Sequence, residues 1–208
     1  MIKAIFFDYD GVLTIDKTGS LTTTRYLSKC TGLDDTFIRK AFSRYNDDLN
    51  TGKITHRDIW RDVCNTLNCE MSLDWLRLAF ESTPMNDAMF SLARRLRANY
   101  RLGIITDNKK DRIAHLRTYQ GLDLLFDPIL VSAEFGSGKD SAAIFTHALD
   151  RLEIRAEESV FIDNSRQNLA APLALGMKTI FHDDEQNDVE ALTRRLTGEL
   201  GLVLSGTA

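Results

Sequence analysis

The chain has 208 residues, of which 43% are hydrophobic and 27% are charged, and its formal net charge is -4. This composition is typical of a globular protein and excludes a disordered, collagen-like or low-complexity chain. The negative charge argues against a broad basic face for nucleic acid, and no apolar run approaches the roughly 20 residues that span a bilayer, so we expect neither nucleic acid nor a membrane as a partner.

The beginning of the sequence has no basic region followed by an apolar signal segment. The three cysteines, Cys30, Cys64 and Cys69, are odd in number and lack the spacing of zinc ligands. We therefore expect a cytoplasmic protein with reduced, partly buried thiols. Secretion with a disulfide framework is the alternative.

The first predicted element is a short strand that ends in two acids. The apolar run Ile5 to Phe7 predicts a buried strand, which delivers Asp8 and Asp10 into the loop at its carboxyl end. Two carboxylates one residue apart beside an apolar sheet are costly unless a cation compensates them. This pattern indicates a site for a metal ion or a charged substrate.

Residues 16–82 show helical periods and no convincing strand. Thr55 and Asp58, three residues apart, predict a capping box at the start of one of these helices. We interpret this segment as an inserted helical unit whose aromatic residues form its core.

From residue 83 onward, strand-length apolar runs alternate with helical periods, as in a parallel sheet covered by helices on both faces. The predicted fold is therefore α/β, with a doubly wound, mostly parallel sheet and an inserted helical cap domain. We assign residues 1–15 and 83–208 to the core and 16–82 to the cap. The predicted later strands are residues 102–105, 129–131, 160–162 and 179–181, and a helix is predicted over 110–119.

Polar residues follow several of these strands at their carboxyl ends, where open parallel sheets bind ligands. Besides the first strand, the groups are Thr106-Asp107-Asn108, Gly136-Ser137-Gly138-Lys139 and Asp163-Asn164-Ser165. The glycine-rich group is not a P-loop, because Ala133 stands where the first glycine is required and Asp140 replaces Ser or Thr.

In this order the motifs resemble those of the haloacid dehalogenase superfamily. The matching parts are Asp8 to Leu13, Ile104 to Thr106, Lys139, and Phe161 to Asp163, and the resemblance extends over nearly the whole chain. It implies a Rossmann-like core, a small helical cap of the C1 type and Mg²⁺ as cofactor. Two departures are Asn164, where a second acid is common, and Asp140, where a proline commonly follows the lysine.

The residue chemistry fits hydrolysis of a small phosphate monoester. Asp8 is the expected nucleophile, which forms an aspartyl-phosphate, and Asp10 is the expected general acid and base. Thr106, main-chain N–H groups near Asp107 and Asn108, and Lys139 are expected to hold the phosphate. The expected Mg²⁺ ligands are Asp8, the main-chain carbonyl of Asp10, and Asp163, with Asn164 as a further candidate.

Three alternatives remain open at this stage. A phosphomutase of the beta-phosphoglucomutase kind uses the same nucleophile and acid/base pair. A haloacid dehalogenase is disfavoured by Asp10, and an inactive binding protein is disfavoured by the complete set of catalytic groups. The sequence indicates a small phosphorylated metabolite as ligand and is compatible with a monomer or a homodimer.

Overall fold

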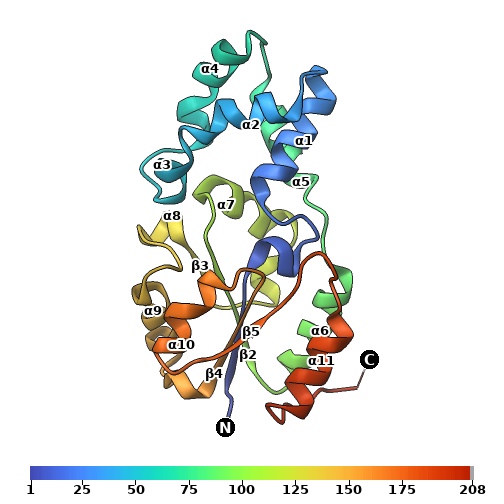
Figure 1. Cartoon of the computed structure of the whole chain (residues 1–208), viewed down its shortest axis with the longest axis vertical. Coiled ribbons are helices and arrows are strands. Elements are labelled where there is room, and N and C mark those ends of the chain that lie inside the picture. Colours follow the sequence, from blue (N-terminus) through green and yellow to red (C-terminus); the bar gives the residue numbers. More distant parts are fainter. Residues whose placement is uncertain (207–208) are drawn as a thin grey trace.

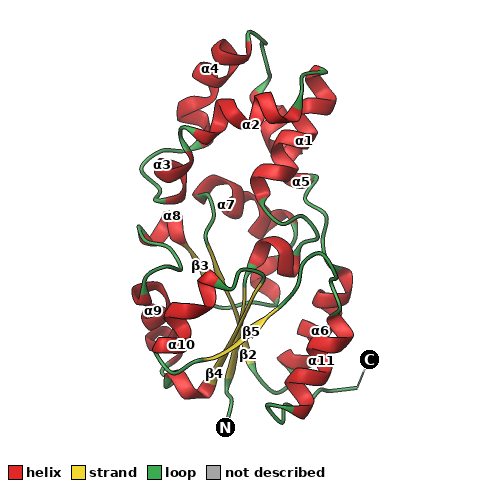
Figure 2. Ribbon diagram, viewed as in Figure 1, coloured by secondary structure: helices red, strands yellow, loops and turns green. Residues whose placement is uncertain are grey.

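The computed structural model describes residues 1–206 and contains one five-stranded sheet in which every pairing is parallel. The strand order is β3-β2-β1-β4-β5 (Figure 2). The strands are β1 (Ala4–Phe7), β2 (Arg101–Thr106), β3 (Ile129–Val131), β4 (Ser159–Asp163) and β5 (Lys178–Phe181). The predicted α/β class and parallel sheet are confirmed, and the predicted strands differ from the observed ones by one residue at some ends.

The side chains of the central strand alternate between the two faces of the sheet, as the period of two requires. Ile5 and Phe7 pack on one face with α6 (Asp87–Arg97), α7 (Lys110–Tyr119) and α11 (Val189–Gly198). Ala4 and Phe6 pack on the other face with α9 (Ala142–Leu152) and α10 (Ala170–Ala174). Both faces of the sheet are therefore covered, which explains the continuously apolar sequence of β1.

Of the six α-helices between β1 and β2, the first five form the helical insertion that the sequence predicts. They are α1 (Gly19–Thr31), α2 (Asp35–Ser43), α3 (Asn46–Asn50), α4 (His56–Leu67) and α5 (Leu73–Glu81), which we call the helical insertion. The predicted capping box of Thr55 and Asp58 is present at the start of α4. Figure 1 shows the insertion at the carboxyl ends of the strands, opposite the N-terminus.

The helical insertion contacts the core through α7 and α8 (Ser132–Phe135). The His56 ring on α4 lies 2.9 Å from Asp111 on α7. The Ser132 hydroxyl donates a 2.9 Å hydrogen bond to the Asn50 carbonyl. These contacts hold the insertion over the carboxyl ends of the strands, where the acidic motifs lie.

The segment after β1 is a single wide turn, Tyr9–Leu13, rather than an open loop. Gly11 has a φ of 75°, in the left-handed region that favours glycine, and an added Cβ would lie 2.2 Å from the Asn164 amide nitrogen. The turn therefore brings the motif that begins at Asp8 directly against the motif of Asp163 and Asn164. Within residues 1–206 no helix has the length and apolar character needed to cross a membrane, and all three cysteines are free.

Candidate active site

Asp8 lies at the carboxyl end of β1 and is 6% exposed. Its main-chain N–H donates to the Ile162 carbonyl at 2.8 Å, which fixes the turn against β4. Its Oδ1 accepts a 2.7 Å hydrogen bond from the Tyr9 N–H, and its Oδ2 lies 2.8 Å from Nζ of Lys139. Burial raises the pKa of Asp8 to about 7, because its effect exceeds the opposing attraction of the Lys139 ammonium.

Lys139 joins the first and fourth motifs. Its Nζ lies 2.7 Å from Oδ2 of Asp163 as well as beside Asp8, and its side chain is 2% exposed. Burial alone would lower the pKa of Lys139, but the carboxylates of Asp8 and Asp163 raise it above its ordinary value. The lysine is therefore a buried cation between two acids that would otherwise repel each other.

Asp163 is completely buried and is held by groups from the segment that follows it. Its Oδ1 accepts a 2.7 Å hydrogen bond from the Ser165 N–H, and the Asn168 amide nitrogen lies 3.2 Å from each carboxylate oxygen. Asn164 packs its amide against Gly11 and, like Asp8, lines the cavity that lies between the strand ends and the helical insertion.

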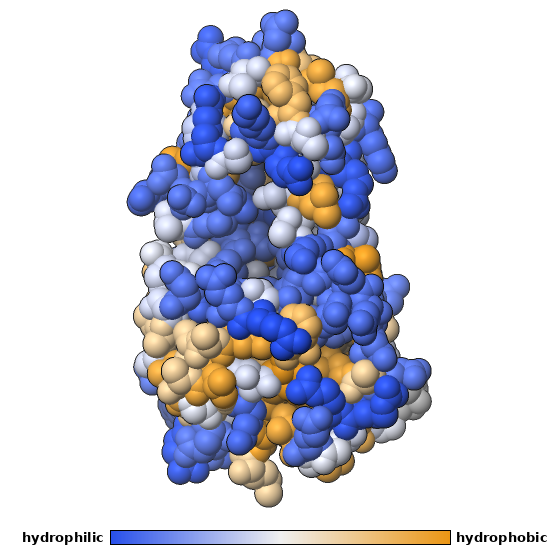
Figure 3. Space-filling view, in the orientation of Figure 1, coloured by the Kyte–Doolittle hydropathy of each residue, from blue (hydrophilic) through white to orange (hydrophobic). Residues whose placement is uncertain are grey.

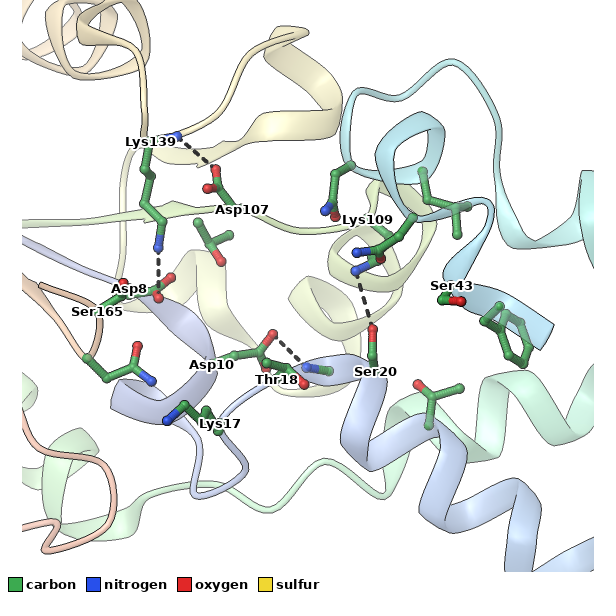
Figure 4. A pocket seen from close by; sticks show the side chains of 18 of the residues that line it. Asp8, Asp10, Lys17, Thr18, Ser20, Ser43, Asp107, Lys109, Lys139 and Ser165 are labelled. Atoms are coloured by element: carbon green, nitrogen blue, oxygen red, sulfur yellow. Dashed lines mark hydrogen bonds and ion pairs between the residues drawn. The ribbon is translucent and has the colours of Figure 1, made fainter. Parts of the chain in front are cut away.

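Asp107 supports the lysine from the second motif. Its Oδ1 accepts a 3.0 Å hydrogen bond from the Lys139 main-chain N–H (Figure 4). An added Cβ on Gly138 would lie 2.9 Å from the same oxygen, so a residue without a side chain is required for this approach. Because its carboxylate is turned to Lys139, Asp107 can offer a phosphate only its main-chain N–H.

Asp10 points away from Asp8, toward the start of α1 (Figure 4). Its Oδ2 accepts from the Gly19 N–H at 3.0 Å, from the Asn108 amide at 2.8 Å and from Nη1 of Arg112 at 2.9 Å. Its Oδ1 accepts from Nη2 of Arg112 at 2.9 Å. In this arrangement the main-chain carbonyl of Asp10, not its carboxylate, is the group left for a metal.

Thr106 and Asn108 are both buried at the end of β2. The Asn108 amide lies 3.4 Å from the Thr106 hydroxyl, and its main-chain N–H donates to the Ser132 hydroxyl at 3.0 Å. Thr106 lines the cavity together with Asp8. Asn108 lies behind the cavity wall, where its amide contacts Asp10. Of the predicted phosphate-binding residues, the structure thus brings Thr106, Asp107 and Lys139 to the cavity wall.

The cavity has a volume of about 730 Å³ and lies between the strand ends and the helical insertion. Figure 3 shows a hollow in the mostly hydrophilic surface of this part of the molecule. The core contributes Asp8 and Lys139, and the insertion contributes polar and aromatic side chains. These include Thr23, Thr24, Arg39, Phe42, Ser43, Asn46 and His56.

The donor set fits an oxygen-ligated divalent cation. Asp8 and Asp163 share Lys139 as a partner, and the Asp10 carbonyl belongs to the same turn as Asp8. Mg²⁺ takes such ligands, a few carboxylates completed by substrate and water. Within residues 1–206, no three Asp, Glu, His or Cys side chains gather as ligands of one metal, so Mg²⁺ at this place would be held by two carboxylates and a main-chain carbonyl.

Two residues of the site, Arg112 and Asn168, were not predicted from the sequence. Arg112 was not predicted, although its position four residues before the apolar Leu116 places it on the buried side of α7. Asn168, which holds Asp163, has no distinguishing sequence signal because an Asn in a turn is ordinary.

A family model described as haloacid dehalogenase-like hydrolase matches residues 2–176. The chain therefore belongs to the haloacid dehalogenase-like hydrolases, as its motif order indicates. It is also 31% identical over 98 residues to a glyceraldehyde 3-phosphate phosphatase of Methanocaldococcus jannaschii. That match covers 42% of this chain and 43% of the relative, so the chain spans less than half the length of this relative.

Solved structures share the fold over most of their length. A HAD-like family hydrolase of Porphyromonas gingivalis aligns with a TM-score of 0.73 and 24% identity, covering 94% of this chain and 98% of that one. A HAD family enzyme of Bacteroides thetaiotaomicron in complex with magnesium and inorganic phosphate aligns with a TM-score of 0.70 and 19% identity, covering 87% and 94%. At these identities the likeness is one of fold.

Proposed function

We propose that this hydrolase cleaves a small phosphate monoester through an aspartyl-phosphate on Asp8, with Mg²⁺ as its cofactor. The observation that carries the proposal is the row formed by Asp8, Lys139 and Asp163, joined by contacts of 2.8 and 2.7 Å, in which Asp8 and Lys139 lie at the wall of a cavity and Asp163 is buried behind them. The phosphatase name of the archaeal relative and the magnesium and phosphate in the Bacteroides structure support it.

In the proposed reaction, a carboxylate oxygen of Asp8 attacks phosphorus and the bond to the leaving oxygen breaks. Lys139 and Thr106 stabilise the charge on the remaining phosphoryl oxygens. Asp10 donates a proton to the leaving oxygen and then takes one from the water that hydrolyses the aspartyl-phosphate. Bound Mg²⁺ would be held by Asp8, Asp163 and the Asp10 carbonyl, with Asn164 as a further candidate, and would neutralise charge on the phosphoryl group.

The charges at the cavity favour an anionic metabolite. Lys17, Arg39, Lys109 and Arg166 lie in its wall with several hydroxyl and amide groups. Burial lowers the pKa of Lys109 to about 8, although nearby Asp10 opposes this shift. A phosphorylated ligand would supply negative charge next to these cations.

We further propose the division into a core of residues 1–15 and 83–208 and a cap of residues 16–82. The insertion supplies much of the cavity wall, so its movement would exclude water during phosphoryl transfer and admit it for hydrolysis. Residues of the insertion would then select the substrate.

The test is a phosphate-release screen over phosphorylated metabolites, with and without Mg²⁺. We expect Mg²⁺-dependent release from at least one small monoester by the wild-type chain and none by the Asp8→Asn variant. With sugar phosphates, isomerised product in place of free phosphate would indicate the mutase alternative. Phosphate release by Asp8→Asn at the wild-type rate would contradict the assigned nucleophile.

A further inference from the structure

Arg112 is a buried arginine for which the reaction described above has no role. It lies in the first turn of α7 and is 1% exposed. Its guanidinium makes two parallel hydrogen bonds to Asp10, both of 2.9 Å. Bidentate contacts of this kind set both the position and the orientation of a carboxylate, whereas a single contact from a lysine does not set the orientation.

Within the core, Nη1 of Arg112 also donates to Asn108 Oδ1 at 3.0 Å, and its Cζ lies 5.4 Å from the centre of the Tyr9 ring. Further contacts of Arg112 lie on the two chain segments that join the helical insertion to the core. Nη2 donates to the Thr83 hydroxyl at 3.2 Å, just after α5. At the other segment, an added Cβ on Gly19, the first residue of α1, would lie 2.2 Å from Cζ of Arg112. One guanidinium therefore touches both ends of the insertion and the Asp10 carboxylate.

Asp10 is bound to the same segment directly. Its Oδ2 accepts from the Gly19 N–H at 3.0 Å in addition to Arg112. If the insertion shifts relative to the sheet, Gly19 shifts with it, so the hydrogen bond from the Gly19 N–H to Asp10 and the close packing of Gly19 against Arg112 change together. The orientation of the acid/base group thus depends on where the insertion sits.

We propose that Arg112 is a positioning residue that orients Asp10 for proton transfer and couples this orientation to the placement of the helical insertion. The proposal rests on the proposed function, in which Asp10 is the general acid and base. A purely structural ion pair would stabilise the chain but would not discriminate between leaving groups. The leaving group therefore separates the two roles.

The experiment compares kcat/KM for two substrates with different leaving groups. The alkoxide that leaves glycerol 2-phosphate must be protonated, whereas the p-nitrophenolate that leaves p-nitrophenyl phosphate need not be. General acid catalysis contributes about 10² to 10⁴ in rate, so loss of its positioning in Arg112→Gln should lower kcat/KM for glycerol 2-phosphate by about tenfold or more. For p-nitrophenyl phosphate we expect a change of less than about twofold. Arg112→Lys, which keeps the charge, should recover part of the loss.

A double variant tests whether Arg112 acts through Asp10. We expect Asp10→Asn with Arg112→Gln to be no slower on glycerol 2-phosphate than Asp10→Asn alone, because residues that act as a unit are not additive. Equal losses on both substrates, or losses that multiply in the double variant, would overturn the proposal. If the wild-type chain cleaves neither phosphate nor any metabolite of the screen, the proposed function itself has failed.

Gly19→Ala tests the same coupling from the insertion without substituting Arg112. Alanine has a higher helix propensity than glycine, so the substitution itself should not weaken α1. The new methyl group, however, displaces the Arg112 guanidinium. We expect the same selective loss on glycerol 2-phosphate. Gly198→Ala on α11, where an added Cβ meets nothing within 4 Å, is the matched control. An unchanged ratio of the two kcat/KM values in Gly19→Ala would contradict the coupling.

Discussion

At the scale of single residues, the site is organised by one buried cation. Lys139 contacts Asp8 and Asp163, and Asp107 holds its main chain. A buried ammonium is costly without partners, and two buried carboxylates are costly without a cation, so each group requires the others.

Asp8→Asn should abolish turnover and leave the protein folded, because an amide keeps the shape of the side chain and removes the nucleophilic oxygen. Phosphate release and thermal unfolding measure the two effects. Asp123→Asn is the control, because Asp123 is exposed and its contact with Arg117 lies outside the cavity. A folded, inactive Asp8→Asn beside an active Asp123→Asn is the expected result, and activity in both would contradict the nucleophile.

Lys139→Met should destabilise the metal-free protein by about 3 to 5 kcal/mol, because Asp8 and Asp163 lose their shared cation. Mg²⁺ should then stabilise this variant more than the wild-type chain. Denaturant unfolding with and without Mg²⁺ measures both effects. An equal Mg²⁺ effect in the two proteins would count against a metal at these carboxylates.

At the scale of elements, the loop between α3 and α4, within the helical insertion, packs against α8 of the core. Gly52 has a φ of 72°, and an added Cβ would lie 1.8 Å from the Ala133 carbonyl oxygen. The neighbouring Asn50 carbonyl accepts from Ser132, whose hydroxyl also accepts from the Asn108 N–H. The glycine thus permits a close approach that extends to the second motif.

Gly52→Ala should separate this loop from α8 and lower both thermal stability and kcat/KM. Gly32→Ala is the matched control: Gly32 also has a positive φ, of 74°, but an added Cβ meets nothing within 4 Å. Both variants carry the strain of a left-handed alanine, about 1 to 2 kcal/mol, and only Gly52→Ala adds a collision. Equal losses in melting temperature and activity would show that the contact with Ala133 is unimportant.

At the scale of the whole molecule, protonation and metal binding compete at Asp8. Its pKa is raised by burial from 3.8 to about 7, so the metal-free folded state holds a proton between these values that the unfolded chain releases. The contribution of Asp8 to stability therefore falls as the pH rises from about 4 to about 7. A divalent cation needs the carboxylate and should bind more weakly below about pH 7.

The increase in melting temperature caused by MgCl₂ should accordingly be larger at pH 8 than at pH 6. In Asp8→Asn this difference between the two pH values should largely disappear. Thermal melts of both proteins at each pH, with chelator as the metal-free reference, provide the measurement. A larger increase at pH 6 in the wild-type chain would contradict the assignment of Asp8 as a ligand.

The sequence by itself determined the fold class and the family. Strand runs such as Ile5 to Phe7 are short and apolar because both faces of a parallel sheet are covered, and the motifs stand directly after such strands. Both signals are local, so residue order alone contains them. The family match over residues 2–176 and the parallel sheet agree with that interpretation.

Only the tertiary structure decided what each acid faces. Asp8 and Asp10 are alike in sequence, but one pairs with Lys139 and the other with Arg112, more than a hundred residues away along the chain. Asn108 follows Thr106 closely and yet contacts Asp10 behind the cavity. Arg112 lies on α7, whereas Lys139 and Asn108 lie in loops that follow β3 and β2. These partners are therefore set by the packing of α7, the loops and the helical insertion against the sheet, which no local pattern records.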